Sequence, residues 1–584
     1  MRVLKSNLLF LYISFMVLVA PTALRADIDA VLWVGDQLPD VSGTFSSFGI
    51  PVLNDAGQIA FSARYIPSNG VGLETGIVKT QVDGSSAEVV AHTGEQVGLE
   101  GDILLNGHGQ PSQSEAGHVA FFAGFMNSSG VTEDGLFREY QGTIEKIAET
   151  GQPAPNGDGR FGQFQALDGT PTINNSGQVG FAVQLIETSN GTRKGMYVGD
   201  STGMNLIART HLPQDLASKF VRSFQGANGV QGPAINNSGT CALAVDLDAP
   251  NQNHMLLRLN PDTDNLDIAL DGGPRLVTGN FNISLSSSGG SAIGVGMNES
   301  SQLVCRGFLG NTPGSGRLIR TTPVLDAVDQ IQTIAVEGDP APLPDGSHSG
   351  NFTAFGPSWA INDLGHLLFS AFAGEIFGDG GLYSWRESTL NAIVRAGQAV
   401  PCDAGHFNNR LFSSNSIPNK HAIALNNADQ VAFQALLDNS PLLSQGLYAW
   451  EPNGQLIQLA RLGSSLFGGT VSSIAFSGGN NERGLERSGF NNAGQVAFRF
   501  NLTDGREGIA VYTPSTSFDA FDIDRDGQVN EHDFTVLLRC MAGPEATSPE
   551  ECDSCDTAGS DFDNDSDIDL NDAALFLSNA ILDP

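Results

Sequence analysis

One eight-residue phrase recurs eight times along this chain of 584 residues, and it limits the possible folds more than any other feature. In a clear form it reads Asn54-Asp-Ala-Gly57-Gln-Ile-Ala60-Phe61. Successive copies begin 60 to 65 residues apart. They start at Asn54, Ser114, Asn174, Asn236, Asn298, Asn362, Asn426 and Asn491. So regular a spacing indicates a repeat architecture in which every copy supplies one supersecondary unit.

The phrase has a local physical interpretation. Asn at the first position and Gly at the fourth suit a type I turn, because the Asn side chain bonds the turn backbone and Gly adopts a positive φ cheaply. The following Gln-Val-Ala-Phe segment alternates polar and apolar residues, which is the period of a strand. We therefore interpret these Asn and Gly residues as turn formers and not as ligands.

Other strand signals accompany the turn in most repeats. One is Gly446-Leu-Tyr448-Ala-Trp450, and another is a strand that ends in Gly, such as Val394-Arg-Ala-Gly397. A short Phe-rich stretch precedes several turns. Glycine is abundant, at 70 of 584 residues, as many tight turns between short strands require. About 62 residues with four strands describe one blade of a β-propeller.

The two ends of the repeat array predict how it closes. The strand that ends in Gly appears first at Leu32-Trp-Val-Gly35, before the first turn, and the array stops at Tyr512 without it. The N-terminal strand can therefore complete the last blade, which removes exposed edge strands. We predict an all-β domain over residues 27–516, an eight-bladed β-propeller closed by its N-terminal strand. A β-sandwich array and an open repeat stack are the alternatives, although an open stack would need polar caps.

The phrase resembles the tandem-repeat family named for Asn-x-x-Gly-x-x-Ala-Phe, which occurs in secreted bacterial proteins. The resemblance covers roughly residues 30–515. It implies an extracellular repeat domain and no established activity.

Residues 1–26 have the pattern of a secretory signal peptide. Arg2 and Lys5 precede an apolar run from Leu8 to Ala20, and cleavage after Ala26 fits the small residues there. A transmembrane anchor is the alternative, but thirteen helical residues span roughly 20 Å, short of the ~30 Å hydrocarbon core. Later segments contain no run of 18 apolar residues. We expect a secreted or cell-surface protein with no membrane span in its mature form.

The charge of the chain disfavours whole classes of partner. The formal net charge is −35, from 64 acidic against 29 basic residues. A field this negative repels nucleic acid and anionic membrane surfaces, and it favours cations.

Two segments near the C-terminus have the spacing of calcium loops. Residues 518–584 contain 18 acidic and two basic residues. A 12-residue calcium loop supplies oxygen ligands from positions 1, 3, 5, 7, 9 and 12, the seventh through its backbone carbonyl. In the first segment these positions are Asp522, Asp524, Asp526, Gln528, Asn530 and Asp533. In the second they are Asp561, Asp563, Asp565, Asp567, Asp569 and Asp572. We predict two Ca²⁺ sites, with an acidic solvated tail as the alternative.

Each loop runs into an apolar helical pattern, and position 12 is Asp where ordinary EF-hands have Glu. A loop followed by one helix, twice, resembles a dockerin over residues 517–584, more closely the GC-type with cysteines between the loops. The resemblance implies a small α-helical domain that folds with Ca²⁺ and docks to a cohesin-like partner. It places the contact positions at Glu531, His532, Leu570 and Asn571, which differ from the Ser-Thr pairs of cellulosomal dockerins.

Six cysteines in an exported chain suggest disulfides. Cys540 with Cys552 or Cys555 would staple the segment between the two loops. Cys241 and Cys305 fall at positions of equal parity in adjacent repeats, so we expect them to be buried thiols that do not meet. Cys402 falls in an expected loop, and its state is open.

The sequence gives little reason to expect catalysis. A Gly-x-Ser-x-Gly match at Gly199–Gly203 lies between two repeat strands, whereas a hydrolase elbow needs a strand, the turn and then a helix. We therefore expect a non-catalytic binding or scaffold protein that docks through its C-terminus and takes a carbohydrate or protein ligand on the propeller. A docked polysaccharide-degrading enzyme is the alternative. The regular repeats leave no blade obviously specialised, and one irregular insert, Phe476–Ser488, is either a ligand surface or a solvated loop.

Overall fold

The computed structural model describes most of the repeat region and a few residues near the C-terminus. These are residues 28–98, 101–155, 158–164, 170–189, 193–210, 221–224, 233–247, 254–260, 265–271, 295–308, 316–324, 327–344, 346–374, 379–401, 405–408, 422–438, 444–479, 488–514, 534, 537–538, 541, 568 and 570–579. They belong to two compact units, one in the repeat region and one near the C-terminus. The expected signal peptide, residues 1–26, lies outside the described residues.

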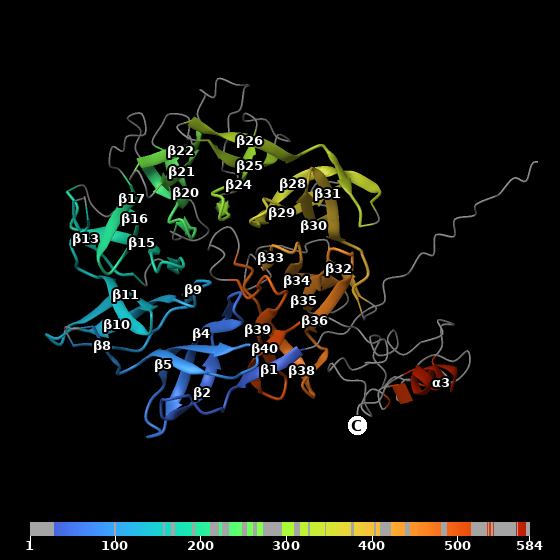
Figure 1. Cartoon of the computed structure of the whole chain (residues 1–584), viewed down its shortest axis with the longest axis horizontal. Helices are drawn as coiled ribbons and strands as arrows, with labels where there is room; N and C mark the ends of the chain where they lie inside the picture. Colours follow the sequence, from blue (N-terminus) through green and yellow to red (C-terminus); the bar gives the residue numbers. More distant parts are fainter. Residues whose placement is uncertain are drawn as a thin grey trace, which may run out of the picture. The chain divides into compact units, whose positions relative to one another are not determined.

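Eight antiparallel sheets follow one another around a central axis, so the repeat region is an eight-bladed β-propeller (Figure 1). Blade 1 contains β2 (Gly43–Phe48), β3 (Val52–Leu53), β4 (Gln58–Pro67), β5 (Glu74–Gln81) and β6 (Glu88–His92). Blade 2 contains β7 (Gln96–Val97), β8 (Asp102–Leu104), β9 (Ser112–Gln113), β10 (Val119–Met126), β11 (Thr132–Tyr140) and β12 (Thr143–Glu149). Blade 3 contains β13 (Arg160–Phe161), β14 (Thr172–Ile173), β15 (Val179–Ile186), β16 (Arg193–Asp200) and β17 (Gly203–Arg209). Blade 4 contains β18 (Val221–Phe224), β19 (Ala234–Ile235), β20 (Cys241–Leu247), β21 (His254–Asn260) and β22 (Asn265–Asp271).

The second half of the ring repeats this plan. Blade 5 contains β23 (Gly296–Met297), β24 (Leu303–Phe308), β25 (Gly316–Val324) and β26 (Ala327–Val336). Blade 6 contains β27 (Pro340–Pro342), β28 (His348–Ile361), β29 (Leu367–Ala373), β30 (Asp379–Arg386) and β31 (Thr389–Arg395). Blade 7 contains β32 (His406–Phe407), β33 (Ile423–Leu425), β34 (Val431–Asp438), β35 (Ser444–Trp450) and β36 (Leu456–Arg461). Blade 8 contains β37 (Ser465–Leu466), β38 (Gly469–Ala475), β39 (Val496–Leu502), β40 (Glu507–Tyr512) and β1 (Ile28–Trp33).

The predicted closure by the N-terminal strand is confirmed. β1 pairs antiparallel with β40, with Ile28 opposite Tyr512 and Trp33 opposite Gly508. Leu32 packs into a buried cluster that joins blade 8 to blade 1. The first strand of the chain thus supplies the outer strand of the last blade and covers an edge that would otherwise be open.

The predicted turns are present in all eight blades. The residue at the fourth position has a positive φ in every copy, even where it is not glycine, as at Ser301 (57°) and Asp429 (62°). In the first copy, the backbone N–H of Gly57 donates to the carbonyl oxygen of Asn54 at 3.1 Å. Glycine is preferred at this position because it reaches the left-handed region without steric cost.

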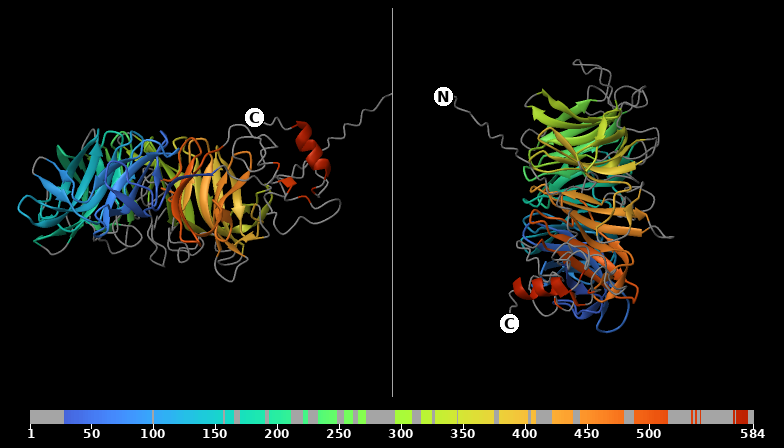
Figure 2. Two further views of the ribbon diagram at one scale, coloured as in Figure 1. Left: turned by 90° about the horizontal axis from the view of Figure 1, so that it is seen from below. Right: turned by 90° about the vertical axis from the view of Figure 1, so that its right-hand side faces the viewer.

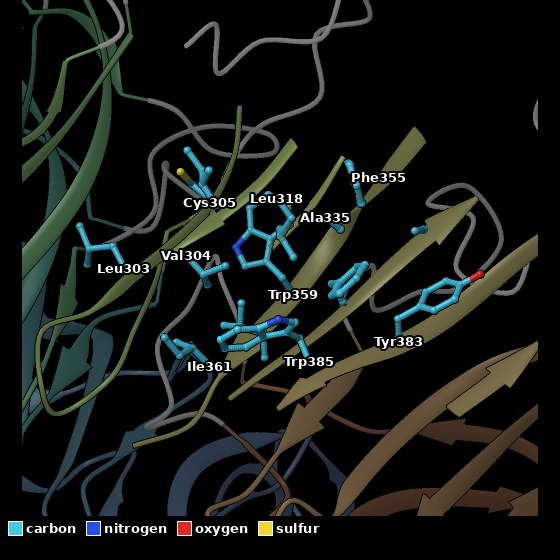
Figure 3. Close-up of a cluster of buried hydrophobic side chains, with 14 of the residues drawn as sticks. Leu303, Val304, Cys305, Leu318, Ala335, Phe355, Trp359, Ile361, Tyr383 and Trp385 are labelled. Carbon is cyan, nitrogen blue, oxygen red and sulfur yellow. The ribbon is translucent and has the colours of Figure 1, made fainter. Parts of the chain in front are cut away.

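The hydrophobic core lies between neighbouring blades. Figure 2 shows the propeller from the side, with the sheets of adjacent blades next to one another. Figure 3 shows part of the cluster between blades 5 and 6, where Trp359 from β28 packs with Leu318 from β25 and Trp385 from β30. The Gly-x-Tyr phrase places a buried tyrosine ring against a glycine two residues earlier in the same strand. A Cβ atom on Gly446 would lie 2.5 Å from the hydroxyl oxygen of the buried Tyr448, so only glycine leaves room for that ring.

The expectation for the two repeat cysteines is also confirmed. Cys241 on β20 and Cys305 on β24 are both buried thiols, and they belong to different core clusters. Burial raises the pKa of the Cys305 thiol to about 12, so it is inert at neutral pH. Cys402, Cys540, Cys552 and Cys555 lie outside the described residues.

The part of the C-terminal unit that the structure describes contains one long helix, α3 (Leu570–Asn579). Phe534, which follows the first predicted calcium loop, packs on Phe576 of α3 with ring centroids 5.6 Å apart. Leu537, Ile568 and Phe576 are buried. The two segments that follow the predicted loops therefore share a small apolar core.

Candidate functional site

The first residue of the repeated turn, where it is Asn, joins its blade to the next one. In the seven blades where it is Asn, its Oδ1 accepts the backbone N–H four residues later, at 2.9 to 3.0 Å. Its Nδ2 donates to a carbonyl oxygen in the turn of the following blade, at 2.9 to 3.4 Å. Asn491 of blade 8 donates to Asn54 of blade 1 at 3.0 Å, so the same contact bridges the junction where the ring of blades closes. The interpretation of these residues as structural is confirmed, and they also hold neighbouring blades together.

The second residue of the turn forms another ring, which sequence reasoning did not single out. In each case a side-chain oxygen accepts a backbone N–H from the turn of the preceding blade, at 2.6 to 3.0 Å. The donor is the second residue of that turn, except in blade 2, where it is Ala116. We call these eight residues the axial ring. They are Asp55, Glu115, Asn175, Asn237, Glu299, Asp363, Asn427 and Asn492.

The axial ring surrounds a cavity of about 280 Å³ that all eight blades line. Next to the axial ring, the wall of the cavity includes the apolar residues that directly precede three of the turns, which are Ile173, Leu425 and Phe490. Gly478 and Ser488, from the two ends of the irregular insert, also line the cavity. Residues 480–487 of that insert lie outside the described residues. The cavity thus combines a polar ring with an apolar wall, as small-molecule sites commonly do.

Four of the eight axial-ring side chains are carboxylates, and three of them have both oxygens occupied. Asp55 accepts the backbone N–H and the Nδ2 of Asn492, at 2.7 and 2.6 Å. Glu299 and Asp363 likewise accept one N–H on each oxygen. Within the described part of the chain no Lys, Arg or His forms a salt bridge with any of the four.

Glu115 differs from the other three carboxylates. Its Oε2 accepts the backbone N–H of Asp55 at 2.6 Å, and its Oε1 has no hydrogen-bond partner among the described residues. Desolvation by the surrounding protein raises the pKa of the Glu115 carboxyl to about 7. The negative charges of Asp55, Glu299 and Asp363 raise it as well. Glu115 therefore presents an open oxygen to the cavity and titrates near neutral pH.

Replacing Glu115 by Gln should stabilise the propeller, and the gain should increase with pH. The folded-state pKa lies above the ordinary glutamate value of about 4.5, so the fold disfavours the ionised form and loses stability as pH rises from about 4.5 through about 7. Because the side chain is exposed to the solvent of the cavity, we discount the effect to about 1 kcal/mol between about pH 5 and about pH 8. Melting temperatures of variant and wild type at both pH values measure it. Glu187→Gln, on an exposed ion pair, is the control, and a gain independent of pH would contradict the assignment.

The structure bears on few of the predicted calcium ligands. Eleven of the twelve predicted ligands lie outside the described residues. They are Asp522, Asp524, Asp526, Gln528, Asn530, Asp533, Asp561, Asp563, Asp565, Asp567 and Asp569. Asp572, at position 12 of the second loop, is in the first turn of α3, and its side chain is fully buried. Of the expected docking positions, Leu570 and Asn571 are exposed on α3, and Glu531 and His532 are not described.

The Gly-x-Ser-x-Gly match is a hairpin turn, as expected. Asp200 pairs with Gly203 across the hairpin of β16 and β17, so the turn leads directly into a strand and not into a helix. The Ser201 hydroxyl donates to Glu145 of the neighbouring blade at 2.9 Å. Ser201 is therefore not positioned as a hydrolase nucleophile.

Among the residues that the structure describes, no three His, Cys, Asp or Glu side chains gather in a group suited to a metal ion. No helix in the described part of the chain has the length and apolar character needed to cross a membrane.

Some solved structures are distantly similar to the chain. The β-propeller domain of the Trilobed protease from Pyrococcus furiosus is 10% identical, with a TM-score of 0.33 over 71% of this chain and 96% of that one. The C-terminal WD40 domain of Sif2 is 10% identical, with a TM-score of 0.36 over 84% of this chain and 99% of that one. The polysaccharide lyase Uly1 is 8% identical, with a TM-score of 0.32 over 68% and 88%. These identities are too low to bear on function.

No curated protein matches the chain. A model of one protein family, described as a family of unknown function (DUF7453), matches residues 25–210 and 169–515. The two matches together span the whole propeller. The chain therefore belongs to the DUF7453 family, and its described propeller is a closed ring of eight repeats around a polar axial cavity.

Proposed function

We propose that this protein is a secreted, non-catalytic binding protein. Its propeller takes a carbohydrate or protein ligand at the axial cavity. Its C-terminal segment, residues 517–584, binds two Ca²⁺ ions and docks to a cohesin-like partner. The axial part rests on one observation: each of the eight blades contributes a polar side chain to a single cavity. Concave sites with convergent polar groups over an apolar wall are the ordinary place for a small ligand.

Several residues support the calcium and docking part of the proposal. The spacing of Asp and Asn in the two segments matches the ligand positions of calcium loops. Asp572, the proposed position 12 ligand of the second loop, is fully buried in the first turn of α3, where a calcium loop runs into its helix. Leu570 and Leu577 are exposed on α3, seven residues apart and so on one face, which gives the helix an apolar surface for a partner.

Secretion and disulfide formation are parts of the same proposal. They rest on the leader pattern of residues 1–26 and on the cysteines between the two calcium loops. Cys540 would pair with Cys552 or Cys555 in an oxidising compartment.

One observation favours the enzymatic alternative. Glu115 has the raised pKa of a general acid and an open oxygen on a cavity. Glycoside hydrolysis, however, needs two working carboxylates. The other three carboxylates of the axial ring have each oxygen occupied by an N–H donor, which makes them poor bases and nucleophiles. We therefore favour binding without hydrolysis.

Retention and hydrolysis on one panel of polysaccharides separate the two functions. The full chain is incubated with insoluble cellulose, chitin, xylan and mannan, and both bound protein and released reducing ends are measured. We expect retention on at least one polysaccharide without release of reducing ends. Release of reducing ends by the wild type that disappears in Glu115→Gln would establish the enzymatic function. If the protein binds none of the four polysaccharides, the proposal of a carbohydrate ligand is wrong.

A further inference from the structure

Blade 2 departs from the repeat at Asp102 on β8. Asp102 lies two residues before Leu104. The backbone N–H of Leu104 donates to the carbonyl oxygen of Glu95 at 2.9 Å, and its carbonyl oxygen accepts the N–H of Gly94 at 2.8 Å. Five other blades form the same pair of bonds, at Phe45, Phe161, Phe352, Phe407 and Val471. In these blades the position of Asp102 is glycine, namely Gly43, Gly159, Gly350, Gly405 and Gly469. Asp102 thus puts a carboxylate where those blades have no side chain.

Blade 2 departs from the repeat a second time, at Lys146 on β12. Lys146 lies opposite Phe137 of β11, directly next to a bulge in the pairing of these two strands. The seven other blades have a bulge at the same place, and an uncharged residue occupies the position of Lys146 in each. These residues are Ala30, Val89, Leu206, Ile268, Thr333, Ala392 and Gln458. The amine of Lys146 is therefore a feature of blade 2 alone at this position.

The two exceptional side chains meet across the sheet of blade 2. β10 and β11 lie between β8 and β12, and the Nζ of Lys146 lies over the buried Phe125 ring of β10, 4.6 Å from its centroid. This Nζ is 2.5 Å from Oδ2 of Asp102 and 2.6 Å from Oε2 of Glu149. The Asp102 side chain is 3% exposed. One amine thus contacts two carboxylates, and one of these is shut off from solvent.

We infer that an isopeptide bond joins Nζ of Lys146 to Cγ of Asp102, and that Glu149 moves the protons of the reaction. The bond staples the inner hairpin of blade 2 to its outer strand. It is independent of the ligand proposed for the axial cavity.

The reaction is a condensation that releases one water. Glu149 takes a proton from the Lys146 ammonium group, and the free amine attacks Cγ of Asp102. The N–C bond forms, and one C–O bond of the carboxyl group breaks. The departing oxygen leaves as water, with the proton that Glu149 returns and a second proton that the nitrogen loses. An ammonium and a carboxylate thus become a neutral amide, and no oxidant or further reactant is needed.

Proximity and burial favour this step. Cγ lies one bond of about 1.2 Å beyond Oδ2, so it is within about 4 Å of the amine, close to the ~3–3.5 Å from which bound groups react. Desolvation lowers the pKa of the Lys146 amine, but its bonds to Asp102 and Glu149 raise that pKa by more. The amine is therefore charged until a carboxylate takes its proton, which Glu149 is placed to do. Since burying two charges is costly, conversion of the pair into a neutral amide removes that cost.

A tryptic digest of the denatured full chain, read by mass spectrometry, tests the inference. Trypsin cuts after Lys and Arg, so without the bond Asp102 lies in fragment 80–138 and Lys146 ends fragment 139–146. An amide at Lys146 blocks the cut there, so we expect one branched species that joins 80–138 to 139–160. Its mass should be that of the two fragments less about 18 Da, the mass of one water. Fragmentation of this species should place the link at Asp102 and Lys146.

Two variants and one internal control make the digest specific. Lys146→Arg keeps the positive charge, but a guanidinium stays protonated and cannot attack, so its digest should contain only separate fragments. Glu149→Gln keeps the size of the side chain and loses the proton acceptor, so the branched species should form about a hundredfold more slowly during refolding. Lys79 forms ion pairs of 3.0 Å with Glu88 and Glu139, and trypsin should still cut after it, because denaturation separates an ion pair.

Three results would overturn the inference. Separate fragments 80–138 and 139–146 from the wild type would show that the pair is only ionic. A branched species that persists in Lys146→Arg would place the link at another residue. Unchanged formation of the branched species in Glu149→Gln would contradict the proton transfer assigned to Glu149. The wild-type digest decides the first point by itself, so the test does not depend on the folding of either variant.

Discussion

Replacing Asp329 by alanine should destabilise the propeller by about 3–5 kcal/mol. Asp329 on β26 of blade 5 is fully buried and accepts two hydrogen bonds from Arg258 on β21 of blade 4, at 2.8 and 2.9 Å. The Thr321 hydroxyl donates to the same carboxylate at 2.9 Å. Loss of the carboxylate leaves the buried Arg258 guanidinium without its counter-charge, which is among the costliest single changes in a protein interior. Urea unfolding of the variant against the wild type measures the effect.

An exposed ion pair is the control for this change. Asp504 and Arg506 lie 2.8 Å apart with their side chains 46% and 42% exposed. Because solvent screens such pairs, Asp504→Ala should leave the urea unfolding midpoint nearly unchanged. Equal losses in the two variants would mean that the buried pair contributes nothing beyond an ordinary surface contact.

Deleting β1, residues 28–33, should abolish the cooperative unfolding of a monomeric propeller. The deletion removes the strand that pairs with β40 and leaves that edge open. It also uncovers Ile509 and Val511, which pack with Leu32 in the cluster between blades 8 and 1. Open apolar edges lead to association, so we expect oligomers by size-exclusion chromatography and loss of a single sharp melting transition.

Rescue by the missing strand makes this prediction specific. A synthetic peptide that contains residues 28–33, added during refolding, should restore part of the monomer. A monomeric deletion variant that melts like the wild type would show that the ring closes without its N-terminal strand.

The fold could be predicted from the sequence because its signals are local and repeated. Asn54 and Gly57 specify a turn by side-chain hydrogen bonding and by positive φ, and the strand after them follows from its alternation. Closure was predictable as well, since the Leu32–Gly35 strand stands alone before the first turn. Parity within the strands predicted that Cys241 and Cys305 would remain thiols.

The candidate site could not be predicted in the same way. The axial ring consists of Asn, Asp and Glu at the second turn position, and those residues look like ordinary turn formers in a single repeat. Their convergence depends on eight turns meeting around one axis. The open oxygen of Glu115 depends on which neighbours donate to it, and no spacing encodes that. The signal that was available is the second turn position, which is Asp, Glu or Asn in all eight repeats when they are aligned by register.

We assign calcium binding to the C-terminal segment and ligand binding to the axis of the propeller. Calorimetric unfolding of the full chain, with and without millimolar Ca²⁺, tests this division most directly. We expect a large propeller transition that Ca²⁺ does not move and a small transition that Ca²⁺ raises. The double variant Asp524→Ala with Asp563→Ala should lose the calcium-dependent shift, because ligands at position 3 of both loops are removed. A chain without any calcium-dependent transition would contradict the assignment. So would a calcium shift of the large transition that survives the double variant and disappears in Glu115→Gln, since the cation would then sit among the carboxylates of the axial ring.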